Sequence, residues 1–127
     1  MKNLIILLTL ITLVFQSCNN DDDDPLVEDV IVSPYAGMWK GTYDGDDSGT
    51  WWAEVSESGQ PVRGGSYSNN AGLSQTNKSG SISTDGVWLS LANNGTEGTG
   101  QIEGNKVTGT WYNPNNNLSG TSIGSKE

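Results

Sequence analysis

Histidine is absent from the chain, and cysteine occurs only once, at Cys18. Histidine is the commonest general base and the commonest metal ligand, so its absence removes the most frequent routes to acid–base catalysis and zinc binding. A lone cysteine has no intramolecular disulfide partner. Serine and threonine are plentiful, but no histidine or suitably placed lysine is present to activate them as nucleophiles. We therefore expect a protein that is not an enzyme and that uses no cofactor.

Basic residues are scarce: six Lys and Arg stand against fifteen Asp and Glu, which gives a formal net charge of −9. Binding to nucleic acid depends on a cluster of basic side chains that neutralise phosphates. The sequence has no such cluster, which argues against nucleic acid as a partner.

The longest apolar run is too short to cross a bilayer as a helix. Residues 4–15 form a run of about a dozen residues, whereas a helical span needs roughly 20. Together with the basic Lys2, this run has the form of a secretory signal peptide, which is removed from the mature protein. We therefore predict a signal peptide over residues 1–17 and an exported chain that starts at Cys18.

The residues around Cys18 resemble the lipobox of bacterial lipoproteins. Ser17 and Cys18 match the small residue and the cysteine of that motif, while Phe15 and Gln16 depart from its strict form. The looser form is typical of Bacteroidota-type lipoproteins, and the following NNDDDD is similar to their export signal for the cell surface. The resemblance implies diacylglycerol and palmitate-type acyl chains on Cys18, and anchorage in the outer membrane with exposure at the cell surface. The alternatives are a cleaved signal with an incidental cysteine and a membrane-spanning helix.

Residues 18–33 are predicted to form a flexible acidic tether between this lipid and a folded domain. They contain six acidic side chains and no basic one. Like charges in such a block repel each other and keep the chain extended. Acylation also protects a lone thiol from oxidation outside the cell, and two or three acyl chains, at about 0.8 kcal/mol per buried CH₂, anchor a protein stably.

The remaining residues, 34–127, are predicted to form one small all-β domain. Short runs that alternate apolar and polar residues, as antiparallel strands do, are separated by turn sequences such as Asp44-Gly45 and Asp85-Gly86. No stretch shows a helical pattern. The expected strands cover residues 38–43, 50–56, 62–68, 73–77, 87–92, 98–103, 106–112 and 118–124, and residues 79–83 either continue the strand before them or form another.

The links between these strands are short, and short links allow only sequential antiparallel neighbours. An open sheet would leave two unpaired edges, whereas a barrel has none. Glycine alternates with bulky residues on the inward faces, as Gly41 does with Trp39 and Gly109 with Trp111, which permits bending and leaves room for indole rings. We therefore predict an up-and-down meander that closes into a small seven- or eight-stranded barrel, with a β-sandwich as the alternative.

The sequences MWKGTYD and GTWYN resemble segments of avidin-like and lipocalin-like barrels. This resemblance implies the same barrel architecture. In the avidin family GTWYN lies in the first strand and its asparagine contacts biotin, whereas here the motif ends at Asn113, in the last strand but one. The resemblance therefore assigns no ligand contact to Asn113.

Three aromatic side chains, Trp52, Trp88 and Tyr112, are predicted to lie on the outer face of the barrel, opposite the main apolar set. Outward aromatic side chains stack on sugar rings or contact a protein partner. They are the candidate residues for binding a glycan, a small ligand or a protein. The alternative is that they only cover the exterior of the barrel.

The loop sequence DGDDSG places oxygen atoms at Asp44, Asp46 and Ser48, spaced as in the first half of an EF-hand loop. The twelfth position is Val55, where an EF-hand needs a bidentate glutamate, and no helix flanks the loop. We therefore expect a solvated hairpin loop, with these three residues as weak candidates for calcium.

These features predict a membrane-anchored lipoprotein whose barrel is a non-catalytic binding or interaction module. A protease inhibitor and a structural component of the cell envelope are the alternatives. The absence of a disulfide weakens the first of these.

Protease treatment of intact cells, followed by mass spectrometry of the N-terminal peptide, tests the predicted anchor. We expect a peptide that begins at Cys18 and carries the added mass of its acyl chains, and we expect fragments of the domain to be released from unbroken cells. An unmodified Cys18 thiol in the native protein would contradict the anchor.

Overall fold

The computed structural model describes residues 29–127, and one folded unit covers Ile31–Glu127. The predicted signal peptide, Cys18 and most of the predicted tether lie outside the described residues. The part of the chain that the structure describes holds no helix long and apolar enough to span a bilayer.

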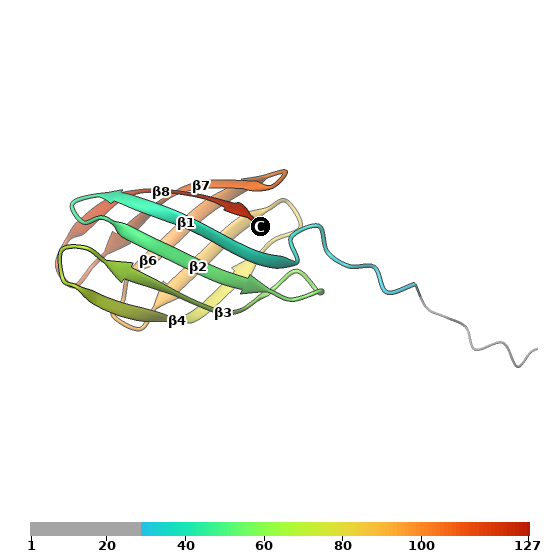
Figure 1. The fold of residues 1–127 in the computed structure, drawn as a ribbon, viewed down its shortest axis with the longest axis horizontal. Coiled ribbons are helices and arrows are strands. Elements are labelled where there is room, and N and C mark those ends of the chain that lie inside the picture. Colours follow the sequence, from blue (N-terminus) through green and yellow to red (C-terminus); the bar gives the residue numbers. More distant parts are fainter. Residues whose placement is uncertain (1–28) are drawn as a thin grey trace, which may run out of the picture. The chain divides into compact units, whose positions relative to one another are not determined.

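Eight antiparallel strands form a closed barrel (Figure 1). They are β1 (Gly37–Gly45), β2 (Gly49–Val55), β3 (Pro61–Ser68), β4 (Leu73–Ile82), β5 (Val87–Ala92), β6 (Glu97–Glu103), β7 (Lys106–Asn113) and β8 (Leu118–Lys126). Each strand pairs with its neighbours in the sequence, and β8 pairs with β1 from Trp39↔Lys126 to Gly45↔Gly120. The predicted meander and barrel are confirmed, and the β1–β8 pairing rules out the sandwich.

Residues 79–82 continue the strand predicted at residues 73–77, so both segments belong to β4. Its register with β5 shifts between Asn77 and Ser79. Before this irregularity Gln75 and Asn77 are half-buried, and after it Ile82 is fully buried. Because side chains alternate between the two faces, Ile82 would point outward without a change of phase, and a bulge supplies that change.

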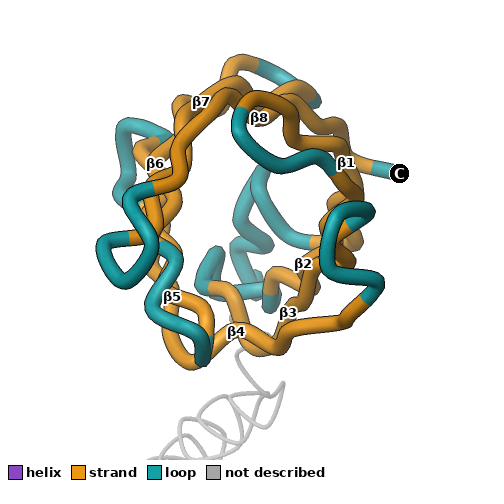
Figure 2. Tube along the Cα trace, turned by 90° about the vertical axis from the view of Figure 1, so that its left-hand side faces the viewer, coloured by secondary structure: helices purple, strands orange, loops and turns teal. Residues whose placement is uncertain are grey.

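The two ends of the barrel differ in what covers them. At one end, which we call the closed end, residues 31–36 run beneath the turns between strands: the Ser33 N–H donates to the Glu57 carbonyl (2.8 Å) and the Tyr35 hydroxyl to the Thr84 carbonyl (3.0 Å). The opposite end, formed by the loops at residues 46–48, 69–72, 93–96 and 114–117, we call the mouth, and Figure 2 looks into it.

Large apolar side chains fill the closed half of the barrel. Trp39 is fully buried, and its indole N–H donates to the Tyr35 carbonyl (2.8 Å). The ring of Trp88 packs edge to face against Trp39 and against Trp51, with centroids 5.6 and 5.9 Å apart. The core consists of Trp39, Ala53, Val55, Ile82, Trp88, Ile102 and Val107.

Glycines on the inner wall make room for these rings. A Cβ at Gly41 would lie 2.6 Å from the indole of Trp51, and one at Gly124 would collide with the same ring from the neighbouring strand. A Cβ at Gly120 would lie 2.6 Å from the indole nitrogen of Trp111. The predicted packing of glycine against a tryptophan ring is therefore confirmed for Gly41. It is wrong for Gly109, where an added Cβ would meet the backbone of Thr99 and Gly100 instead of a ring.

Two tryptophan substitutions on adjacent strands measure the contribution of the core. Trp39→Ala should lower the free energy of unfolding by about 3–5 kcal/mol, because it leaves a cavity where a buried indole stood. Trp52→Ala is the matched control: Trp52 is 38% exposed, and its loss should cost about 1 kcal/mol. Denaturant unfolding of both variants makes the comparison, and equal losses would contradict this account of the core.

Candidate functional site

A cavity of about 320 Å³ lies inside the mouth half of the barrel. Its floor is made by Ala53, Trp88 and Val107, which also belong to the core. An eight-stranded barrel can hold one small ligand where side chains leave its interior empty, and this volume lies within the range of small-molecule sites. The interior is empty here because inward wall positions carry small residues: Ser66, Ser90, Ala92, Gly98, Gly100 and Ser122.

Five aromatic residues line this cavity; Trp52 faces outward, and the rings of the other four point inward. The rings of Trp51 and Trp88 pack edge to face near the floor. Nearer the mouth, the rings of Tyr43 and Trp111 pack in the same way, with centroids 5.6 Å apart. The indole N–H of Trp111 donates to the Asp44 carbonyl (3.1 Å) and holds that ring in place. Aromatic side chains give the cavity apolar surface of fixed shape, which is what small-molecule sites commonly use for affinity.

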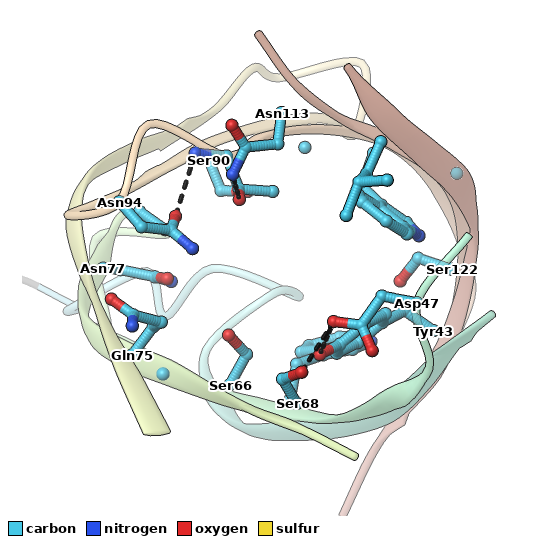
Figure 3. Close-up of a pocket in the computed structure, with 18 of the residues that line it drawn as sticks. Tyr43, Asp47, Ser66, Ser68, Gln75, Asn77, Ser90, Asn94, Asn113 and Ser122 are labelled. Atoms are coloured by element: carbon cyan, nitrogen blue, oxygen red, sulfur yellow. Dashed lines mark hydrogen bonds between the residues drawn. The ribbon is translucent and has the colours of Figure 1, made fainter. Parts of the chain in front are cut away.

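Asp47 carries the only charged side chain among the residues that line the cavity. Its carboxylate accepts from the Ser68 hydroxyl (2.7 Å) at one oxygen and from the Ser48 and Asn70 amides (2.7 and 3.4 Å) at the other. The Tyr43 hydroxyl lies 3.4 Å from the first oxygen and shares its proton between Asp47 and the Tyr67 carbonyl (3.1 Å). These donors come from β1, from β3 and from two mouth loops. The carboxylate is therefore held firmly at the rim, beside Tyr43 and Ser68 (Figure 3).

The ionisation of Tyr43 responds to this environment. Burial raises the pKa of its phenol above the ordinary value, and the negative charge of Asp47 raises it further. The Ser68 hydrogen bond acts in the opposite direction. Tyr43 is therefore a neutral hydrogen-bond donor at neutral pH.

Amide side chains lie across the cavity from Asp47. Figure 3 shows Gln75, Asn77 and Asn94 on that side, with Asn113 above them. Asn113 is buried; its amide donates to the Thr96 hydroxyl (3.0 Å), and its carbonyl accepts from the Asn115 N–H (2.9 Å). The cavity therefore offers uncharged polar groups on one side and a carboxylate on the other.

Within the described residues, one buried side-chain polar atom has no hydrogen-bond partner: Nε1 of Trp51. Leaving such a donor unpaired costs stability. Trp51 lines the cavity, and its nitrogen edge lies against Gly41.

The predicted orientation of Trp88 is wrong. Its side chain is 7% exposed and points inward, where it forms the floor of the cavity. In β5 both faces are apolar, and the sequence interpretation placed Val87 and Leu89 inside. In the structure Val87 is 37% exposed and Leu89 is 49% exposed. The inward face of β5 instead carries Trp88, which fills the barrel at the cavity floor, and the small Ser90 and Ala92 nearer the mouth.

Trp52 and Tyr112 do face outward, as predicted, but they do not form one patch. They lie on β2 and β7, which are separated around the barrel by β1 and β8. The indole of Trp52 covers Gly65, whose added Cβ would lie 3.1 Å from its nitrogen. The hydroxyl of Tyr112 donates to the Asn117 side chain (3.3 Å). The structure therefore does not unite the three predicted aromatic residues in one site.

The three weak calcium candidates are engaged within the loops of the mouth. Asp44 accepts from the Gly45 N–H (2.9 Å), Asp46 from the Ser119 N–H (3.0 Å), and the Ser48 hydroxyl from the Asn69 amide (3.1 Å). Among residues 29–127, no group of three or more His, Cys, Asp or Glu side chains could hold a metal ion. These oxygens stabilise loop conformations.

Sequence reasoning missed the cavity, and with it Asp47, Tyr43 and Asn113 as site residues. Asp47 lay inside the loop that was considered for calcium, at a position where an EF-hand has no ligand. A signal was present in the small residues that alternate along the inward face of β3, β5 and β6, since they leave the interior unfilled.

No protein-family model, no curated protein and no solved structure matches this chain. The lipoprotein resemblance and the avidin-like or lipocalin-like resemblance therefore stay predictions.

Asp47→Asn should lower the pKa of Tyr43. The substitution removes the negative charge that opposes formation of the tyrosinate, and it also removes the carboxylate that accepts from the neutral phenol. An NMR titration of the tyrosine ring carbons measures this change. Glu103→Asn removes one carboxylate at the closed end and should leave Tyr43 unaffected, and a Tyr43 pKa that is the same in all three proteins would contradict the assigned coupling.

Proposed function

We propose that this protein is a lipid-anchored receptor of the outer membrane and cell surface, and that its barrel binds a small molecule in the mouth without catalysis. The observation that carries the proposal is the cavity of about 320 Å³, with an apolar floor, aromatic walls and a few fixed polar groups. Small-molecule sites in proteins combine these features.

The direction of the cavity fits anchorage through Cys18. The chain enters the barrel through residues 31–36, which are bonded to the turns of the closed end. Twelve residues lie between Cys18 and Ile31, and a chain of that length spans at most about 45 Å. A lipid on Cys18 would thus be linked to the barrel through its closed end, opposite the mouth.

The lining supports binding over catalysis. General acid–base chemistry needs a titratable group that is free to exchange a proton with the substrate. The Asp47 carboxylate accepts hydrogen bonds from the Ser68 hydroxyl and from the Ser48 and Asn70 N–H groups, and no second carboxylate lines the cavity beside it. Its fixed position suits recognition of a ligand.

Filling the cavity tests the proposal. In Ser66→Leu/Ser122→Leu, two bulky side chains replace hydroxyls on the inner wall. We expect ligand-detected NMR with a set of neutral, cationic and anionic fragments to find binders of the unchanged protein whose affinity falls at least about tenfold in this variant, since the volume is occupied.

Thr50→Leu/Thr121→Leu is the matched control, because it adds the same two side chains at exposed positions of β2 and β8. This variant should keep the affinities of the unchanged protein. Fragments that bind equally well to both variants would show that the cavity is not the binding site.

A further inference from the structure

We propose that the ligand carries a quaternary ammonium group, which sits at the mouth beside Asp47, Tyr43 and Trp111. This inference rests on the proposed function, because it names the chemical class that the same cavity takes. Three independent features of the mouth lead to it: the distribution of charge along the barrel, the protein hydrogen bonds that fill most lone pairs of Asp47, and the aromatic pair next to that carboxylate.

Charge is distributed unequally between the two ends of the barrel. Acidic side chains surround the mouth, and the basic side chains of the described residues lie away from it. The acids of the mouth are Asp44, Asp46, Asp47 and Glu97. The bases of the closed half are Lys40, Arg63, Lys106 and Lys126, and Lys78 lies midway along β4. Three of the bases are engaged there: Lys40 pairs with Glu127 (2.7 Å), Arg63 pairs with Glu54, and Lys126 donates to the Pro34 carbonyl (2.9 Å). A mouth lined by charge of one sign raises the local concentration of the opposite ion, here a cation.

The hydrogen bonds of Asp47 select the kind of cation. A carboxylate has about four lone-pair sites, and three protein donors already point at this one: the Ser68 hydroxyl and the Ser48 and Asn70 N–H groups. The single proton of the Tyr43 hydroxyl is shared between Asp47 (3.4 Å) and the closer Tyr67 carbonyl (3.1 Å). A primary ammonium would bring three N–H donors, of which Asp47 has room to accept about one, and buried unpaired donors cost binding energy. A quaternary ammonium has no N–H, so it gains from the negative charge without needing a lone pair.

The aromatic pair beside Asp47 suits the same group. The Tyr43 hydroxyl lies 3.4 Å from the carboxylate, and the ring of Tyr43 packs against Trp111 with centroids 5.6 Å apart. Cations are attracted to aromatic rings within about 6 Å, and quaternary ammonium ligands are commonly recognised by aromatic cages. A cation at this position would therefore interact with the two rings and the carboxylate together.

An anionic ligand is disfavoured by the same lining. No Lys or Arg side chain is among the lining residues, all of which are described. An anion that entered the cavity would lose its hydration without gaining a counter-charge. The amides opposite Asp47 can instead accept a hydrogen bond from a hydroxyl, or donate one to a hydroxyl or carbonyl, on the uncharged part of the ligand.

Choline and 3,3-dimethylbutan-1-ol, its uncharged isostere with carbon in place of nitrogen, test the inference directly. Isothermal titration calorimetry at low salt should show choline binding about tenfold more tightly than the alcohol. Asp47→Asn should weaken choline binding at least about fivefold and leave the alcohol unchanged, whereas Glu103→Asn, which removes a carboxylate at the closed end, should change neither.

The outcomes separate this inference from the proposed function. Equal affinity for choline and the alcohol, with both lost in Ser66→Leu/Ser122→Leu, would overturn the ammonium inference and keep the cavity as a binding site. No saturable binding of millimolar choline, or binding of choline that persists in the filled variant, would also overturn it, and the fragment experiment would then decide the proposed function alone. If Asp47→Asn does not fold, the affinity of the unchanged protein for choline is measured at increasing salt concentration instead. This affinity should fall as salt rises, and an affinity independent of salt would contradict the role of the carboxylate.

Discussion

Edge-to-face packing of three indole rings is the interaction on which this barrel depends. Trp88 contacts Trp39 on one side and Trp51 on the other, with centroids 5.6 and 5.9 Å apart. Such pairs contribute about 0.5–1.5 kcal/mol each beyond the burial of their surface. The rings fit because Gly41 and Gly124 leave space on the inner wall. Apolar volume is thus concentrated at the closed end, and the strands close into a ring whose mouth half keeps a cavity of about 320 Å³.

The mouth is held together by polar contacts instead of apolar packing. Asp47 ties β1 and β3 to two loops, and Asn113 ties the end of β7 to Thr96 and to Asn115. Networks of this kind hold a site in one arrangement before a ligand arrives. The division between an apolar floor and a polar rim therefore combines a stable barrel with an interior that stays open.

Much of the fold was predictable, because period-2 alternation and short turns leave few arrangements other than a meander. The predicted strands match β1 to β8 closely, and the closure follows from the need to pair both edges. The candidate site was less predictable. In β5 the choice between Val87 or Trp88 inside could not be made from alternation alone, since both faces of that strand are apolar. Asp47 and Asn113, far apart in the sequence, had no local pattern that joined them.

The sequence by itself determined the class of fold, the number and order of the strands to within one, and the absence of histidine from any site. Those properties depend on local periodicity, turn residues and composition, which act over a few residues. Only the tertiary structure decided that the interior is empty at the mouth and filled at the closed end, and that Asp47, Tyr43 and Trp111 share one rim. Both results depend on how closure and the β4 bulge set the phase of each strand, which brings residues from distant strands to the same level of the barrel.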